Sequence, residues 1–176
     1  LKKNNIRSSS FHDQVIYPPG FLKTGQGNPF SVFTPYKRRW VENFDMNFLD
    51  IVEISKPRRP SSINSDLSAL KFVKTHSANI DLWPAGESAA QEKLSNFLQL
   101  KANSYNESRN SPIVDGTSKI SPYLALGILS PKRCILEGLK LNDFEFTSGN
   151  KGICKWMDEI VWREFYRNIM HSFSKV

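Results

Sequence analysis

The sequence predicts a mainly α-helical protein that is preceded by the end of an α/β domain. Up to Tyr36 the chain is dense in turn-forming Pro and Gly, with two short β-type runs between them. A polar, basic, proline-rich segment follows at 56–62, and beyond it apolar residues recur at helical spacing. We therefore expect the end of an α/β domain over 1–50, an interdomain linker over 51–80, and the incomplete first part of a helical domain over 81–176.

The first 50 residues predict two extended pieces and one helix. The runs Asp13–Tyr17 and Phe30–Phe33 lie between turn formers and are typical of short extended segments. A helix is expected next, with Thr34 as its N-cap and Pro35 at its first position. Four apolar residues would share one face of this helix: Tyr36, Trp40, Val41 and Phe44.

Helical patterns dominate after the linker. A helix is expected to open at 86–88, and two more at Ser121-Pro122 and Ser130-Pro131, where serine supplies an N-cap and proline the first helical position. The last helix should run from about Lys151 to Phe173. The core-facing residues of the helix that opens at 86–88 are Ala90, Leu94, Phe97 and Leu98, and those of the last helix are Ile153, Trp156, Met157, Ile160, Val161, Phe165 and Ile169.

Composition narrows the classes of protein to consider. The 176 residues are 39% hydrophobic, which excludes a disordered tail. Two cysteines, Cys134 and Cys154, cannot build a disulfide framework and lack metal-ligand spacing, so we expect a reducing setting and no metal. No apolar run reaches the roughly 18 residues of a membrane span. The net charge of +7 is compatible with nucleic-acid binding, but many basic proteins bind none.

A glycine followed by three hydroxyls and a cation precedes the helix at 121. Gly116 allows close backbone approach, and Thr117, Ser118, Lys119 and Ser121 supply donors and positive charge. The segment suits a phosphate or diphosphate. The alternative is a polar loop before an ordinary capped helix.

A second constellation lies on the last helix. Glu159, Trp162, Arg163 and Tyr166 fall at helical spacing, so an acceptor, an aromatic plane, a cation and a phenol would share one face. Such a face suits stacking and hydrogen bonding of a planar heterocycle. The alternative is an amphipathic helix with ion pairs. The pair Tyr105 and Arg109, four residues apart, means little by itself.

Taken together, these motifs resemble the DNA photolyase and cryptochrome family, and specifically its class I cyclobutane pyrimidine dimer photolyases. Each motif alone is weak, whereas their shared order along the chain is specific. The resemblance extends from about Asp13 onward. The segments that carry it are 31–36, 83–87, 105–109, 116–127 and 159–167.

The resemblance implies an FAD enzyme that flips a pyrimidine dimer out of DNA and splits it by light-driven electron transfer from reduced flavin. It implies FAD contacts at Tyr105, Thr117, Ser118, Lys119, Ile120, Ser121, Trp156 and Arg163. It implies catalytic lesion contacts at Glu159 and Trp162. DNA contacts are implied at Arg109, Glu159, Trp162, Arg163 and Tyr166.

Two residues depart from the family pattern: Lys119 stands where arginine is frequent, and Ile120 where leucine is usual. Segments that contact the flavin ring in the family come later than this chain, so we expect the middle of a photolyase and weak or no FAD binding by the chain alone. The resemblance further implies an antenna chromophore, methenyltetrahydrofolate or deazaflavin, and a monomeric full-length enzyme. We expect it to act on dimer-containing DNA, away from membranes, in the nucleus or also the mitochondrion.

Two other functions remain open from the residues. A cryptochrome-type blue-light photoreceptor would bind flavin without repairing DNA, although Glu159 with Trp162 favours repair. A cofactor-free helical nucleic-acid-binding module would purify without a flavin absorption band.

Overall fold

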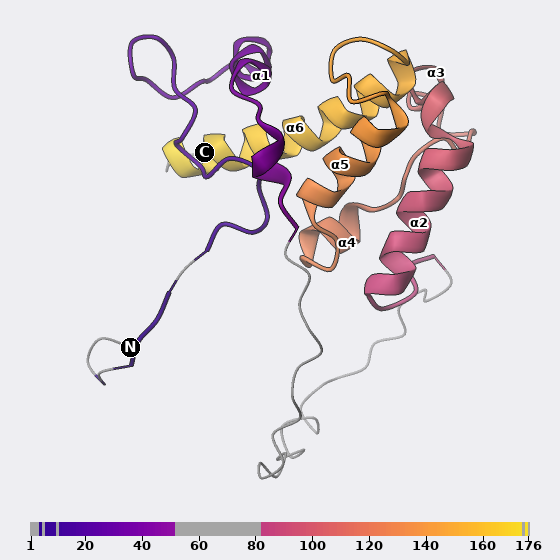
Figure 1. Cartoon of the computed structure of the whole chain (residues 1–176), viewed down its shortest axis with the longest axis horizontal. Helices are drawn as coiled ribbons and strands as arrows, with labels where there is room; N and C mark the ends of the chain where they lie inside the picture. Colours follow the sequence, from indigo (N-terminus) through magenta and orange to yellow (C-terminus); the bar gives the residue numbers. More distant parts are fainter. Residues whose placement is uncertain (1–3, 5, 10, 52–81, 174, 176) are drawn as a thin grey trace.

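A computed structural model describes residues 4, 6–9, 11–51, 82–173 and 175. Within these residues the chain is mainly helical and has no β-strand, which confirms the predicted fold class (Figure 1). The elements, in order, are α1 (Phe33–Glu42), the 3₁₀ turn η2 (Met46–Leu49), α2 (Glu87–Leu100), the 3₁₀ turn η4 (Ala102–Ser104), α3 (Tyr105–Ser108), α4 (Ser121–Ala125), α5 (Pro131–Leu141) and α6 (Lys151–Ser172).

Helix α6 is the central element. It runs across the molecule, with α1 beside its C-terminal part and α2, α3 and α5 toward its N-terminal end (Figure 1). Asn150 caps it, because its side chain accepts hydrogen bonds from the N–H groups of Gly152 at 2.8 Å and Ile153 at 3.1 Å. The predicted helix is therefore confirmed, ending one residue earlier than expected. Of its seven predicted core residues, all but the partly buried Ile169 are buried.

Helix α1 confirms one prediction and corrects another. Tyr36 and Trp40 are buried, as expected, while Val41 and Phe44 are partly buried against the core. Thr34 is not the N-cap: the helix begins at Phe33, the residue before it makes no side-chain capping bond, and Thr34 lies inside the first turn.

The two predicted extended pieces form no β-strand among the described residues, and the second ends where α1 begins. Residues 13–17 have no strand partner, and Phe33 already belongs to α1. The physical reason is that the backbone donors of the first piece are taken by a side chain. The N–H groups of Ile16 and Tyr17 donate to the Glu164 carboxylate at 2.5 and 3.2 Å, so no ladder is needed to satisfy them.

The other helix starts are mostly as expected. Helix α2 begins at Glu87 after Gly86, and all four of its predicted core residues are buried. Ser130 caps α5 by accepting a hydrogen bond from the Lys132 N–H at 3.2 Å. Ser121 is not a cap: it is the first residue of α4, and Ile120 precedes it without a side-chain bond.

The expected linker over 51–80 falls almost wholly outside the described residues, so the division into domains stays a prediction. Within the described part of the chain, no helix combines the length and the apolar composition that crossing a membrane requires.

Candidate functional site

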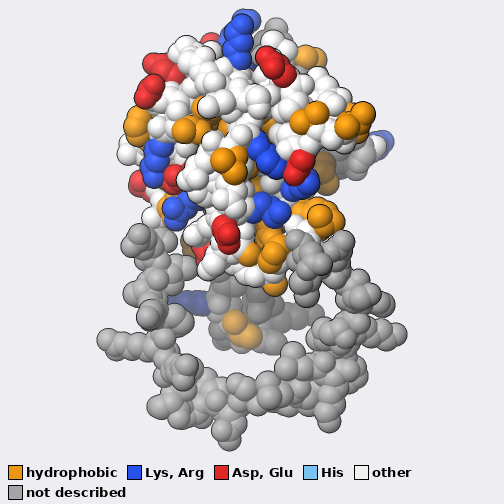
Figure 2. Space-filling model, turned by 90° about the vertical axis from the view of Figure 1, so that its right-hand side faces the viewer, with side chains coloured by type: hydrophobic (Ala, Val, Ile, Leu, Met, Phe, Trp, Pro, Cys, Tyr) orange, Lys and Arg blue, Asp and Glu red, His pale blue; other side chains and the backbone are white. Residues whose placement is uncertain are grey.

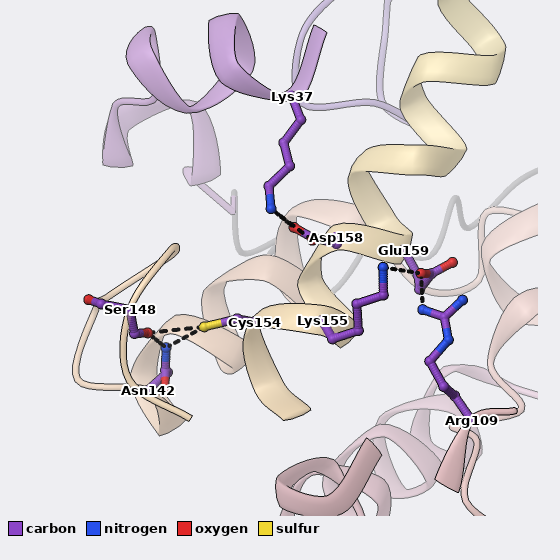
Figure 3. A network of polar contacts seen from close by, with 8 residues as sticks. All are labelled: Lys37, Arg109, Asn142, Ser148, Cys154, Lys155, Asp158 and Glu159. Carbon is purple, nitrogen blue, oxygen red and sulfur yellow. Dashed lines mark hydrogen bonds and ion pairs between the residues drawn. The ribbon is translucent and has the colours of Figure 1, made fainter. Parts of the chain in front are cut away.

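Three predicted residues, Tyr105, Arg109 and Glu159, meet where α3 lies against α6. Arg109, which follows α3, pairs with Glu159 on α6, and Lys155 lies one turn before that carboxylate, 3.7 Å from its Oε1 (Figure 3). The Arg109 guanidinium also lies over the ring of Tyr105, 5.7 Å from its centroid. Burial and the nearby Glu159 raise the pKa of Tyr105. A carboxylate held between two cations thus stands next to a buried phenol, a pairing that sequence spacing did not predict.

One turn further along α6, aromatic rings stack. Trp162 lies nearly parallel to Phe33, with ring centroids 3.6 Å apart and 10° between the planes. Tyr166 stacks on Trp162 at 5.6 Å and is 58% exposed. Trp162 and Tyr166 therefore share the predicted face with Glu159. Phe33 was missed as a site residue, although it lies in the segment 31–36 that helped to carry the family resemblance.

The predicted phosphate segment lines a cavity of about 500 Å³. Thr117, Ser118 and Lys119 form one side of it, and Lys93 and Lys101 from α2 and its C-terminus contribute positive charge. On this side of the molecule, basic and acidic side chains are intermixed (Figure 2). Two acids, Glu92 and Asp115, line the cavity as well, so its lysines give it only a small excess of positive charge.

Contacts within the chain hold this segment in shape. Lys119 has a positive φ of 52°, and its carbonyl accepts a hydrogen bond from the Trp83 indole at 2.9 Å. Asp115 lies between Lys101 at 2.9 Å and Lys119 at 2.8 Å, and hydrogen bonds from these two lysines lower its pKa to about 2. Neither Trp83 nor Asp115 was predicted as a site residue. Trp83 lies in a segment that carried the resemblance, but nothing in the sequence marks Asp115.

Phe97 connects the cavity to two other predicted FAD residues. It lines the cavity and contacts Trp156 at 5.3 Å and Tyr105 at 5.7 Å between ring centroids. Trp156 itself is only 2% exposed and packs in the core. Phe97 was predicted only as a core residue of α2, so its place between the cavity and these rings is a finding of the structure.

The remaining predicted residues are placed differently. Ile120 is buried in the core, so a ligand could reach only its backbone, whereas Ser121 is exposed at the start of α4. Arg163 points away from the stacked rings: its guanidinium donates to the carbonyls of Gln14 at 2.7 Å and Leu124 at 3.0 Å. Burial lowers its pKa. The Arg163 guanidinium thus binds groups outside α6, and among the described residues it makes no hydrogen bond or ion pair with Glu159.

Both cysteines are free thiols, and burial raises the pKa of Cys134 to about 12. Among the described residues, no cluster of His, Cys, Asp and Glu could hold a metal ion.

The helical fold matches that of a photolyase. The structure superposes on a bacterial class III photolyase from Agrobacterium tumefaciens with a TM-score of 0.73 and 29% identity, covering 99% of this chain and 37% of that one. The DNA photolyase family model matches residues 1–60.

Curated relatives of similar sequence are also named photo-lyases. The deoxyribodipyrimidine photo-lyase of Escherichia coli K12 is 35% identical over 166 residues, which cover 94% of this chain and 35% of that protein. Its counterpart from Vibrio cholerae is 30% identical over 175 residues, covering 97% and 36%. Over most of its length the chain is therefore similar to members of the DNA photolyase family. It spans about a third of the length of these relatives, and its assignment to class I stays a prediction.

Proposed function

We propose that this chain is part of a photolyase that binds DNA containing cyclobutane pyrimidine dimers and splits them by light-driven electron transfer from reduced FAD. The names of its relatives support this activity. The observation that carries the proposal is the arrangement on α6, where Glu159, held by Arg109, is followed one turn later by the partly exposed ring of Trp162.

The residues around the cavity suit the diphosphate of FAD. Thr117 and Ser118 would donate hydroxyl hydrogen bonds to its oxygens, and Lys93, which unlike Lys101 and Lys119 is not paired with Asp115, would offset part of its charge. Tyr105 and Trp156 contact the cavity-lining Phe97 and complete the aromatic part of the predicted FAD set. Reduced FAD, when bound, would supply the electron that breaks the dimer.

The α6 face would hold the lesion. Flipping a dimer out of the duplex costs a few kcal/mol of lost stacking and pairing, which an aromatic platform offsets in part. Trp162 would stack on the dimer, and the Glu159 carboxylate would accept a hydrogen bond from a base edge. Arg109, beside that carboxylate, would contact a phosphate and add affinity that depends on salt. Tyr166 extends the same surface. Arg163 would contribute by holding the backbone in place at the carbonyls of Gln14 and Leu124, to which its guanidinium donates hydrogen bonds.

Glu159→Ala in the full-length protein tests this role. Losing a hydrogen bond to a charged acceptor costs about 1.5–3 kcal/mol, so the affinity for dimer-containing DNA should fall about 10- to 100-fold. The quantum yield of repair under near-ultraviolet or blue light should fall as well. Binding to an oligonucleotide with one dimer, compared with its undamaged copy, measures the first effect.

Glu137→Ala is the matched control, because Glu137 on α5 also lies between two cations, Arg133 at 3.7 Å and Lys140 at 3.0 Å. It should leave lesion affinity unchanged. Unchanged affinity and quantum yield in Glu159→Ala would remove Glu159 from the site. A flavin-containing wild type without repair activity would favour the cryptochrome alternative, and a colourless protein that binds no FAD would favour the cofactor-free module.

The antenna chromophore, the monomeric state and a nuclear or mitochondrial location stay predictions that rest on the family resemblance.

A further inference from the structure

Phe33 covers one face of the indole that the proposed function assigns to the lesion. Its ring centroid lies 3.6 Å from that of Trp162, with 10° between the planes. The two residues are 129 positions apart, one at the start of α1 and the other on α6. The Trp162 ring thus has only part of its surface left for a base.

Helix α1 holds Phe33 in this place. Lys37, one turn further along α1, forms an ion pair with Asp158 on α6 at 2.7 Å (Figure 3). Another turn on, the Trp40 indole N–H donates to the Glu164 carboxylate at 2.9 Å. Three successive turns of α1 therefore contact α6, so the orientation of the Phe33 ring is set by the docking of the whole helix.

A second contact restricts the phenylalanine itself. Phe33 meets Phe165 edge to face at 5.8 Å and 72°, and Phe165 is buried. The ring is therefore fixed from behind by the core while its flat face meets Trp162. Phe165 and Tyr166 on α6 itself also contact the Trp162 indole, at 5.7 and 5.6 Å between ring centroids. Phe33 adds a contact from another helix, which narrows the rotamers open to the indole further.

We propose that Phe33 is a positioning residue for lesion binding, which it serves by holding the Trp162 indole in the orientation that accepts a flipped base. This inference rests on the proposed function. It makes the first turn of α1 part of the lesion site, although no residue before Tyr105 was expected there. Preorganisation of this kind raises affinity because the ring's freedom is lost before DNA arrives.

The test uses Phe33→Leu in the full-length flavin-loaded enzyme, because leucine keeps apolar bulk and loses the flat ring. Its affinity for a single-dimer oligonucleotide in the dark should fall about 2- to 10-fold, the range of an aromatic pair. Phe33→Tyr keeps the aromatic ring and should bind the same oligonucleotide with wild-type affinity. Flavin content and circular dichroism show whether Phe33→Leu folds normally. If it does not, Phe33→Met is measured in its place.

Phe44→Leu is the matched control. Phe44 stacks on the Trp40 indole, with ring centroids 5.1 Å apart and 17° between the planes. The substitution therefore removes a similar contact between a phenyl ring and an indole, away from the exposed rings of α6. Fluorine NMR of protein labelled with 5-fluorotryptophan separates the two: Phe33→Leu should shift the Trp162 resonance, identified by its absence in Trp162→Phe, and Phe44→Leu should shift that of Trp40. Only the first should weaken lesion binding.

A double-mutant cycle distinguishes positioning from general loss of stability. In a Trp162→Phe background, Phe33→Leu should weaken lesion binding by less than twofold, because its effect passes through the indole. An equal loss in both backgrounds, or unchanged lesion affinity in Phe33→Leu, would overturn the inference and leave the proposed function intact. A flavin-loaded wild type that does not prefer dimer-containing DNA would overturn the proposed function, and this inference with it.

Discussion

Asp115 is an exposed carboxylate whose ionisation is set by two lysines from different parts of the chain. Hydrogen bonds from Lys101 and Lys119 lower its pKa from an ordinary value of 3.8 to about 2. Its side chain is 57% exposed, so solvent screens much of the attraction. The contact joins the end of α2 to the predicted phosphate segment, and it helps to keep both lysines at the cavity.

This pair of contacts predicts a small pH dependence of stability. Because the folded-state pKa is depressed, the contribution is complete well above pH 3.8, the unfolded value, begins to be lost about one pH unit above it, and disappears as the pH falls through about 2. It should amount to less than about 1 kcal/mol. Asp115→Asn should therefore flatten the slope of unfolding free energy against pH between 5 and 3, measured by urea titration at low salt. Identical slopes for the two proteins, or a difference that 0.5 M salt leaves unreduced, would contradict it.

Individual residues were predictable from the sequence where local spacing decides their position. Glu159, Trp162 and Tyr166 do line one side of α6. Arg163 does not join them, because the carbonyls of Gln14 and Leu124 compete for its guanidinium. Spacing on a helix says which residues are neighbours, whereas the direction of a long side chain depends on which partners the rest of the chain brings near.

At the scale of elements, α6 comes unusually close to the 3₁₀ turn η4. A side chain on Gly152 would collide with the backbone carbonyl oxygens of Ala102 and Asn103. Gly152 is in the first turn of α6 and is buried. This contact sets the distance between α6 and the segment that leads into Tyr105 and Arg109, so it helps to bring Arg109 to Glu159.

Gly152→Ala should therefore destabilise the protein, although alanine is the better helix former. Backbone carbonyls cannot turn away as a flexible side chain can, so we expect a loss of about 1–3 kcal/mol in unfolding free energy, measured by denaturant titration. Gly25→Ala is the control, since its added methyl would meet nothing within 4 Å. A Gly152→Ala protein as stable as the wild type would show that α6 and η4 can separate freely.

The helices themselves were largely predictable, because their apolar periodicity is a property of the chain. Helices α2, α5 and α6 begin within one residue of the expected positions. The errors lie at N-caps and at the end of the second extended piece, where α1 begins. Thr34 and Ser121 carry the right hydroxyl for a cap, yet each lies inside its helix. Cap choice depends on where the preceding backbone turns, and tertiary contacts decide that.

At the scale of the whole molecule, Glu164 ties the N-terminal part to α6. Its carboxylate accepts hydrogen bonds from the N–H groups of Ile16 and Tyr17 and from the Trp40 indole at 2.9 Å. The residue is only 3% exposed. The neighbouring Asn168 accepts a further bond from the Gly20 N–H at 2.8 Å. One side of α6 therefore replaces the sheet partner that an extended segment would otherwise require.

Glu164→Gln should loosen this attachment. The amide group puts an N–H donor where the native carboxylate only accepts, so at least one buried donor would lose its partner at a cost of about 1–3 kcal/mol. Urea titration followed by tryptophan fluorescence measures the loss, and proteolysis should cut near residues 13–20 sooner. Glu42→Gln removes a carboxylate from an exposed pair with Arg39 at 3.4 Å and should change little. Equal stability of both variants would argue against the attachment.

The amino-acid sequence by itself determined the mainly helical class, the core stripes of α2 and α6, and the resemblance to the photolyases, because all three are encoded in local spacing and in the order of short motifs. Only the tertiary structure decided that Phe33 stacks on Trp162, that Arg109 pairs with Glu159, and that Glu164 binds the N-terminal segment that was expected to be extended. The physical reason is that these contacts join residues 50 to 148 positions apart. Their partners are chosen by how the helices pack, which no local pattern records.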